Sequence, residues 1–267
     1  MNREAARQLV HADEGAIDDL LAIAHRRMAK RLAALKRPEV AVGLCDSPLG
    51  KLLIAVSGAG VALVHFVESG NSERAIGLLR QSFDLAKDEV QAVRVAQEIR
   101  RHLEGDRGAL VSRVDFALVK NPFQRRVLES LAKVPAGAVL TYEALAESVG
   151  VTSGARAVGN VMATNPLPVY LPCHRVVRAG GAVGEYGGGV GMKIKLLRAE
   201  GFSVDAQHRA IRSPVLGHRQ TRIFCRPECN AAPRGRSSHF IMFAGPDHAR
   251  AAGMKPCRIC RPALAGP

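Results

Sequence analysis

The sequence contains no tryptophan, and aromatic residues make up only 4% of its 267 residues. Any platform of aromatic side chains that stacks on unpaired bases would therefore be thin. No apolar run approaches the ~18 residues that a membrane-spanning helix needs, and residues 20–24 are too short for the hydrophobic core of a signal peptide. We therefore expect a cytoplasmic protein without membrane contact, associated with the nucleoid when it binds DNA.

Acidic residues are also scarce, with 24 Asp and Glu against 38 Lys and Arg, a net charge of +14. The excess is uneven, because residues 208–267 carry a net charge of +9 and residues 1–37 carry +3. A basic tail on a nearly neutral body favours a polyanionic partner, with nucleic acid first, although a solvated basic surface is the alternative. The length suggests about two domains, and 47% hydrophobic residues are typical of a globular chain.

Cysteine is infrequent, with six residues, but four of them lie within the last 43 residues. They form two close pairs separated by 27 residues, Cys225 with Cys229 and Cys257 with Cys260. In a cytoplasmic chain such pairs indicate a metal site rather than disulfides. Four thiolates suit tetrahedral Zn²⁺, which can stabilise a segment too small to fold on its own core. We predict a small zinc-stabilised module over residues 216–267.

The first half of the chain predicts an α/β subdomain behind a helical extension. Residues 13–36 have apolar residues at helical spacing, so an amphipathic helix is expected within an extension at 1–37, with its apolar stripe packed on the next domain or a partner. Turn-forming residues separate three β-rich segments, and two helical patterns follow. These predicted strands are 40–44, 51–56 and 61–67, and the predicted helices are 72–83 and 89–104, within a subdomain at 38–115.

Residues 116–202 predict a mostly helical subdomain, which makes the whole chain α+β. A helix begins at Pro122, the first helical position at which proline is tolerated. Thr141 can cap a helix over 142–149, and Ser153 can cap a second helix ending at 163, which together indicate a helix-turn-helix. A last helix is expected at 191–200. Residues 203–215 have little apolar content and are expected to be a linker.

Cys173 and His174 are adjacent, a pattern that can represent a nucleophile and its base. On an extended segment the two side chains point to opposite faces, so a bridging water would carry the proton. A carboxylate would then orient the imidazole from its other side. The thiolate is the reactive form, so the site must lower a thiol pKa of about 8.5. A buried cysteine beside a core histidine is the alternative when the dipeptide is considered alone.

The residues around this pair resemble the O6-alkylguanine-DNA alkyltransferase family. The resemblance covers residues 40–202 and is carried by four segments, 121–129, 165–177, 181–186 and 196–201. It implies repair of double-stranded DNA that contains O6-alkylguanine, by an enzyme that extrudes the damaged nucleotide. The alkyl group would move directly to Cys173 without any cofactor. The thioether product has no route back, so each molecule, expected to be a monomer, would act once.

The resemblance implies roles for individual residues. Cys173 corresponds to the acceptor, His174 to the water-linked base, Glu200 to the carboxylate that orients it, Tyr142 to the donor to guanine N3, and Asn165 to the residue that holds the active-site turn. The implied DNA-binding residues are Ala155, Arg156, Gly159 and Arg175, with Arg156 entering the base stack. The implied substrate pocket contains Tyr186, Gly187 and Gly188. Many family members have serine at the position of Gly187, so we expect an altered tolerance for bulky adducts.

Residues 221–229 and 251–262 resemble the zinc module of Ada-type methyl-response proteins. The resemblance implies that Cys225 is both a zinc ligand and a second acceptor, for methyl from DNA phosphotriesters, with phosphate contacts from Arg222, Arg226 and Arg258. Residues 210–220 match the strand-rich lead of that module poorly, and no regulator-type helix-turn-helix follows. The alternatives are a non-enzymatic DNA-damage sensor and a methyl-responsive transcriptional regulator. Known sensor relatives lack the acceptor, so the presence of Cys173 favours the enzyme.

Overall fold

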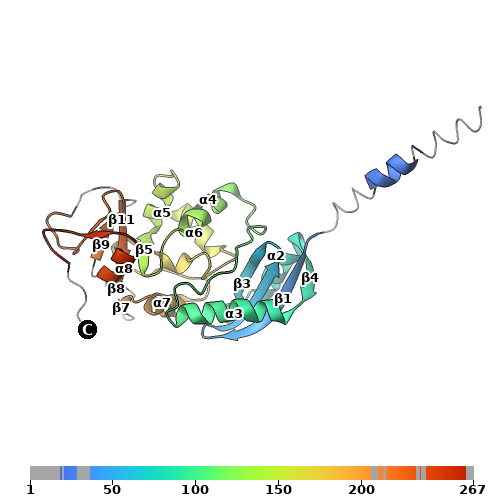
Figure 1. Ribbon diagram of the computed structural model, residues 1–267, viewed down its shortest axis with the longest axis horizontal. Coiled ribbons are helices and arrows are strands. Elements are labelled where there is room, and N and C mark those ends of the chain that lie inside the picture. The colour runs from blue at the N-terminus through green and yellow to red at the C-terminus, as the bar shows by residue number, and fades with distance from the viewer. Residues whose placement is uncertain are drawn as a thin grey trace, which may run out of the picture.

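The fold was obtained as a computed structural model that describes residues 19, 21–28, 37–205, 210–212, 215–232, 235 and 239–262. Two subdomains and a C-terminal module follow one another along the longest axis (Figure 1). Residues 21–28 form a helical segment that projects away from this body (Figure 1).

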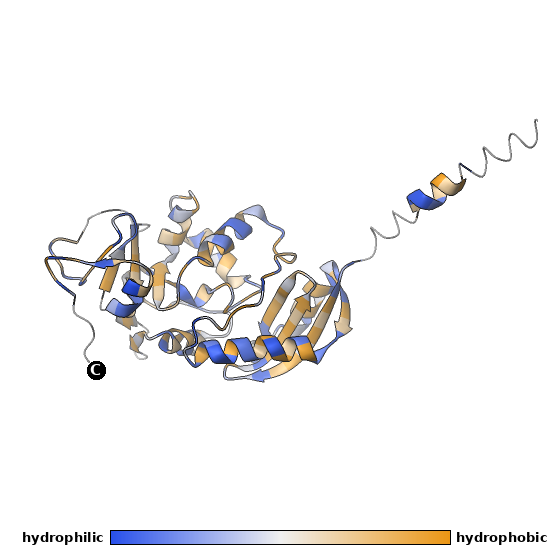
Figure 2. Ribbon diagram, viewed as in Figure 1, coloured by the Kyte–Doolittle hydropathy of each residue, from blue (hydrophilic) through white to orange (hydrophobic). Residues whose placement is uncertain are grey.

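The N-terminal subdomain is a four-stranded sheet in the order β3-β2-β1-β4, covered by helices. Strands β1 to β3 are antiparallel, whereas β1 and β4 are parallel. Its strands are β1 Glu39–Ser47, β2 Gly50–Ser57, β3 Gly60–Phe66 and β4 Asp84–Lys87, and its helices are η1 Val67–Ser69, α2 Ser72–Ser82 and α3 Glu89–Leu103. The central strands are the most hydrophobic part of this unit (Figure 2). The expected α/β architecture is confirmed, and β4 is an addition to it.

The β1–β2 hairpin and the start of α3 follow from local chemistry. Gly50 has a φ of 93°, a left-handed conformation that glycine adopts without a steric penalty. The side chain of Asp88 accepts a hydrogen bond from the backbone N–H of Val90 and so caps α3. Strand β4 escaped prediction because the side chains of its four residues are exposed or only partly buried, which leaves no apolar alternation to detect.

The catalytic subdomain contains the expected helix-turn-helix. Its elements are α4 Pro122–Leu131, β5 Ala138–Thr141, α5 Tyr142–Ser148, α6 Ala155–Ala163, η2 Cys173–Arg175, β6 Val176–Val177, η3 Ala179–Gly181 and α7 Val190–Ala199. Thr141 caps α5 by accepting from the N–H of Ala144 at 3.0 Å. The expected cap of α6 is wrong, because Gly154 is its N-cap residue. Ser153 instead lies in the turn with a φ of 55°, and its N–H is bonded to Glu143.

The C-terminal module shares one sheet with the catalytic subdomain. The six strands have the order β12-β10-β9-β11-β5-β6, so β11 pairs directly with β5. The module contributes β9 Val215–His218, β10 Ile223–Cys225, β11 Phe240–Phe243, α8 Pro246–Ala251 and β12 Lys255–Pro256. Phe224 and Phe243 are fully buried and belong to the same core cluster as Leu140 and Cys173. The module is therefore packed onto the catalytic subdomain as part of one core.

The expected linker at 203–215 is wrong. This segment contains β7 Ser203–Asp205 and β8 Ala210–Arg212, which pair with each other, and β9 begins at Val215. Val204 and Ile211 are buried in a cluster with Val177 and Leu197. Each of these two strands is only three residues long, so the sequence offers too little periodicity to reveal them.

The expected packing of the N-terminal amphipathic helix is not found in its described part. Residues 19 and 21–28 are helical, as expected, but Leu21, Ile23 and Met28 are exposed by 51%, 42% and 59%. The other residues of the predicted 13–36 helix lie outside the described part of the chain. No helix among the described residues is long and apolar enough to cross a membrane.

Candidate active site and metal centre

Cys173 is the first residue of the short helix η2 and is 5% exposed. Its Sγ accepts a hydrogen bond from Asn165 Nδ2 at 3.1 Å, and the same amide group donates to the carbonyl of Leu171 at 2.8 Å. Asn165 Oδ1 accepts from the N–H of Leu167. Asn165 therefore connects the thiol to the turn that precedes it.

The expected extended geometry of Cys173 and His174 is wrong, because both residues lie in a 3₁₀ turn. A 3₁₀ helix rotates by about 120° per residue, so the two side chains still point in different directions. His174 is fully buried, and its Nε2 lies 2.9 Å from Glu200 Oε1. Its Nδ1 is also buried and has no hydrogen-bond partner among the described residues. Burial lowers the pKa of His174 and the Glu200 carboxylate opposes this, so the neutral imidazole is favoured.

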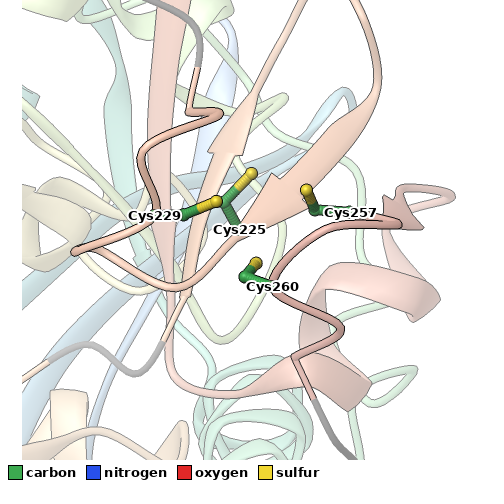
Figure 3. A group of neighbouring side chains, drawn as sticks. All are labelled: Cys225, Cys229, Cys257 and Cys260. Carbon is green, nitrogen blue, oxygen red and sulfur yellow. The ribbon is translucent and has the colours of Figure 1, made fainter.

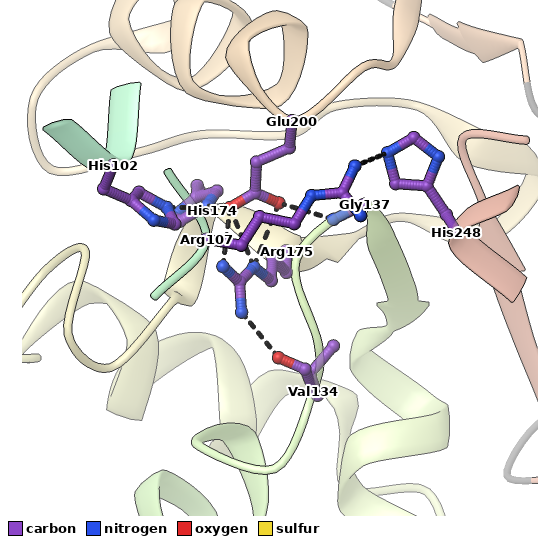
Figure 4. Close-up of polar contacts among 8 residues, drawn as sticks. All are labelled: His102, Arg107, Val134, Gly137, His174, Arg175, Glu200 and His248. Carbon is purple, nitrogen blue, oxygen red and sulfur yellow. Dashed lines mark hydrogen bonds and ion pairs between the residues drawn. The ribbon is translucent and has the colours of Figure 1, made fainter. Parts of the chain in front are cut away.

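Glu200 follows α7 and is 7% exposed (Figure 4). Arg175 donates to this carboxylate through Nε at 3.0 Å and through Nη2 at 2.6 Å, and the backbone N–H of Gly137 donates to Oε2 at 3.2 Å. Burial alone would raise the pKa of Glu200, but its contacts with His174 and His102 and the positive charge of Arg175 bring it well below its usual value. The carboxylate is therefore ionised and fixed in orientation.

The expectation that Arg175 contacts DNA is wrong. Its side chain is buried, and besides Glu200 it bonds the carbonyl of Val134 at 2.5 Å. A guanidinium that neutralises a buried carboxylate cannot also reach a phosphate at the surface, and its removal would leave Glu200 uncompensated.

Lys193 is a component of the site that the sequence reasoning missed. It is fully buried on α7, its Nζ donates to the carbonyl of Val176 at 2.6 Å, and it lies 5.8 Å from the ring centroid of Tyr142. Burial lowers the pKa of Lys193 to about 8. The expected lowering of the Cys173 pKa is not found: burial raises this pKa by more than the Asn165 hydrogen bond and the positive charge of Lys193 lower it, so the thiol of the free protein keeps its proton. A lysine among the apolar residues of a predicted helix was the available signal.

A cavity of about 620 Å³ opens beside Cys173, between the helix-turn-helix and the glycine-rich segment 180–191. Its lining residues include Tyr142, Arg156, Cys173, Arg178, Tyr186 and Gly187. Burial and the nearby Cys173 raise the pKa of Tyr142, so its hydroxyl keeps its proton. Sequence reasoning did not identify Arg178, whereas it placed Gly188 in the pocket. Gly188 does not line this cavity, and a Cβ there would overlap Met192.

Three of the expected DNA-binding residues, Ala155, Arg156 and Gly159, line the same cavity from α6. Arg156 is exposed, and a Cβ added at Gly159 would meet no atom within 4 Å. The structure therefore leaves this side of α6 open in front of the thiol.

A second cavity of about 840 Å³ reaches Cys173 from the junction with the N-terminal subdomain. Asn165, Tyr186 and Gly187 line it together with Phe66 of β3 and residues of α2. A Cβ added at Gly187 would meet no atom within 4 Å, so glycine leaves this passage wide.

The four C-terminal cysteines converge into one cluster (Figure 3). Cys225 ends β10, Cys257 follows β12, and Cys229 and Cys260 lie in the turns after them. All four Sγ atoms lie within 4.8 Å of one another. Tetrahedral Zn²⁺ with Zn–S bonds of about 2.3 Å requires sulfur atoms about 3.8 Å apart, so the donor set and its spacing fit this ion.

Burial raises the pKa of Cys225, whereas backbone N–H groups of Cys260 and Ile259 lower the pKa of Cys257 to about 7. Metal binding would remove the remaining protons, since the thiolate is the ligand. The backbone N–H of Arg226 donates to Cys260 Sγ at 3.4 Å. Of the arginines expected to contact phosphate, Arg222 donates to the carbonyl of Ala252 at 2.5 Å.

Two families match adjoining parts of the chain. The 6-O-methylguanine DNA methyltransferase DNA-binding domain matches residues 122–202, and the metal-binding domain of Ada matches residues 204–263. The second match includes residues 210–220, which corrects the expectation that these residues match the zinc module poorly. Together, the fold, the buried thiol and the cysteine cluster define a DNA-binding alkyl-transfer protein with a zinc-binding module.

The methylated-DNA–protein-cysteine methyltransferase of Mycobacterium leprae is 31% identical over 159 residues, which cover 60% of this chain and 91% of that protein. The chain belongs to this family and is a methylated-DNA–[protein]-cysteine S-methyltransferase that acts in DNA repair. The bifunctional transcriptional activator/DNA repair enzyme Ada of Escherichia coli is 30% identical over 167 residues, 60% of this chain and 45% of that protein. A crystal structure of Mycobacterium tuberculosis OGT in complex with DNA is 28% identical, covers 61% of this chain and 92% of that chain, and superposes with a TM-score of 0.50.

Proposed function

We propose that the enzyme removes alkyl groups from O6 of guanine in double-stranded DNA and retains them on Cys173. The observation that carries this proposal is a buried thiol that lies between an open cavity and the His174–Glu200 pair. Incubation with duplex DNA containing O6-methylguanine, followed by peptide mapping, tests it. The expected product is one methyl group on the peptide that contains Cys173, and an unmodified peptide would contradict the proposal.

The residues present can complete the reaction without a cofactor. His174 Nδ1 takes the thiol proton of Cys173 through a bridging water, and Glu200 stabilises the resulting imidazolium through Nε2. The thiolate forms a bond to the alkyl carbon as the bond from this carbon to guanine O6 breaks. Negative charge then develops on the departing guanine, and the hydroxyl of Tyr142 donates to N3 to offset it. No group in the site cleaves the C–S bond of the thioether again, so one chain performs one turnover.

The damaged nucleotide must leave the duplex to reach the cavity, because Cys173 lies behind α6. We infer that α6 enters the minor groove and that Arg156 fills the space left in the base stack. The site is complete within one chain, which supports a monomer. The clustered free thiols require a reducing compartment, which supports a cytoplasmic location.

We predict that Arg156→Ala slows methyl transfer from duplex DNA by at least about tenfold, because stabilisation of a flipped base is worth a few kcal/mol. Transfer from free O6-benzylguanine should keep the wild-type rate, since the free base needs no extrusion. Single-turnover rates on both substrates check this expectation. Arg101→Ala, which removes an exposed cation from α3, is the control for the loss of charge. Equal losses on both substrates would contradict the role of Arg156.

We further propose that Cys225 accepts methyl from methyl phosphotriesters, as a second activity of the zinc module. Zinc bound by the four cysteines would keep the thiols deprotonated at neutral pH. The Cys225 sulfur would bond to the methyl carbon as the carbon–oxygen bond breaks, and an ordinary phosphodiester anion would leave. The neutral triester lacks the charge that normally repels a thiolate, and Arg226 and Arg258 are near enough in sequence to contact neighbouring phosphates.

In the Cys173→Ala protein, we expect DNA carrying methyl phosphotriesters to place one methyl group on Cys225. The module then becomes more positive by one charge, so DNA binding should tighten and its salt dependence should increase by about 0.9. Peptide mapping and DNA titrations at several salt concentrations measure both effects. If Cys225 remains unmodified while zinc is still bound, the module only binds DNA.

A further inference from the structure

Residues from all three parts of the chain lie around the orienting carboxylate of the active site (Figure 4). Its partners His174 and Arg175 belong to the catalytic subdomain. His102 approaches from α3 of the N-terminal subdomain, with its Nε2 3.5 Å from Glu200 Oε1. The zinc module reaches Glu200 indirectly, through its contacts with Gly137, the residue before β5.

Gly137 bridges the zinc module and Glu200. Its N–H donates to Glu200 Oε2 at 3.2 Å, and its carbonyl accepts from the N–H of Ala244, just after β11, at 2.9 Å. The pairing continues along the strands, where Phe243 lies opposite Ala138. Gly137 thus donates its N–H to the carboxylate, while its carbonyl is held by a hydrogen bond from the module.

His248 of α8 lies against the same backbone. A Cβ on Gly137 would overlap the imidazole, and a Cβ on Gly201, the residue after Glu200, would lie 3.0 Å from His248 Cε1. Both glycines have positive φ values, 73° and 91°. The ring therefore occupies the space that the two missing side chains leave, and it limits how far either backbone segment can move.

A contact from the N-terminal subdomain holds the ring itself. Arg107 Nη2 lies 2.7 Å from His248 Nε2, and a guanidinium can only donate, so the imidazole nitrogen accepts. Burial lowers the pKa of His248, and the Arg107 charge lowers it further, which agrees with a neutral ring. Arg107 and His248 thus connect the loop after α3 to the zinc module across the backbone next to Glu200 (Figure 4).

We propose that the zinc module is a positioning element of the alkyl-transfer site, with His248 as its positioning residue. His248 and Ala244 fix the Gly137 peptide, Gly137 fixes Glu200, and Glu200 orients His174. The module would then support chemistry at Cys173 in addition to any contact with DNA. This inference rests on the proposed roles of His174 and Glu200.

The test compares His248→Ala with the wild type on duplex O6-methylguanine DNA and on free O6-benzylguanine. We expect methyl or benzyl transfer to slow by about fivefold to tenfold, and by the same factor on both substrates. This is the effect of one weakened hydrogen bond. The acid limb of the pH–rate profile should move to lower pH, because a displaced Glu200 no longer raises the pKa of His174. The charged and titratable groups around the pair are His102, Arg107, Arg175 and His248.

His248→Phe keeps a ring over Gly137 and should restore the rate to within about twofold of wild type. Asp247→Ala, an exposed change on the same helix that removes an ion pair with Arg250, is the matched control and should leave rate and pH profile unchanged. The hydrogen-exchange rate of the Gly137 amide, which donates to Glu200, provides a readout that is independent of activity, and it should rise in His248→Ala only.

Two results would overturn the inference: a wild-type rate and pH profile in His248→Ala, or a loss confined to duplex DNA, which would assign the module to binding. Absence of transfer by the wild-type chain would instead contradict the proposed function. If the His248→Ala protein fails to bind zinc, the transfer rate of His248→Phe and the exchange rate of its Gly137 amide become the deciding measurements. In that case, an unchanged exchange rate of the Gly137 amide in His248→Phe together with a tenfold loss of transfer rate would overturn the inference.

Discussion

Cys173→Ser should bind O6-methylguanine DNA with wild-type affinity and transfer no measurable methyl, a loss of at least about a thousandfold. Serine is nearly isosteric, so the Asn165 hydrogen bond and the surrounding core should persist. An alcohol is far less acidic than a thiol, and a neutral imidazole such as His174, the base that we propose, cannot generate an alkoxide to a useful extent. The substitution therefore removes the nucleophile and leaves the binding surface in place.

Single-turnover transfer and DNA-binding titration measure these two properties separately. Cys45→Ser is the matched control, because Cys45 is a buried thiol, 7% exposed, on β1 of the N-terminal subdomain. It should keep the full transfer rate. Methyl transfer by Cys173→Ser, or a methyl group mapped to another residue in the wild type, would show that the acceptor lies elsewhere.

Removal of zinc should unfold the C-terminal module and destabilise the sheet that it shares with the catalytic subdomain. Structural zinc contributes on the order of 10 kcal/mol to the folding of small modules. The four cysteines come from the ends of the short strands β10 and β12 and from the turns after them, whereas β9 and β11 continue the catalytic sheet. A strong chelator should therefore abolish amide protection in β9 to β12 and reduce protection in β5.

Hydrogen exchange with and without chelator measures this effect strand by strand, and restored zinc should recover the original pattern. The β1–β3 amides of the N-terminal subdomain serve as the internal control, since that sheet is separate. Full protection of β9 to β12 after verified loss of zinc would show that the shared core alone, with Phe224 and Phe243 at its centre, keeps the module folded.

Local signals in the sequence predicted a large part of this fold. Thr141 at a helix start and Pro122 at a first helical position are short-range features, and each element began where they indicated. The strands of the N-terminal sheet were recognisable from alternation and turn residues. Ser153 failed as a cap because a glycine one residue later supplies the N-cap position, a choice that several neighbouring turn residues can satisfy equally well.

The environment of the site could not be read from the sequence in the same way. Arg175 looked like a cation available to DNA, and only the fold shows that it neutralises Glu200. Lys193 is a lysine in an apolar part of its helix and His248 has no distinguishing sequence context, and the roles of both depend on contacts with residues distant in sequence. Sequence patterns predict faces and termini of elements, whereas these pairings depend on how β5, α7 and α8 are packed.

The pairing of β11 with β5 has a consequence for how the chain can be divided. Without β9 to β12, the strands β5 and β6 would form a two-stranded sheet with one edge of β5 unpaired. Exposed edges with free N–H and C=O groups recruit other chains and promote aggregation. The module thus covers the free edge of β5. A chain shortened before β9 would expose that edge, and with it an aggregation-prone strand, next to its active site. Removal of β9 to β12 would therefore also lower the solubility of the part that remains.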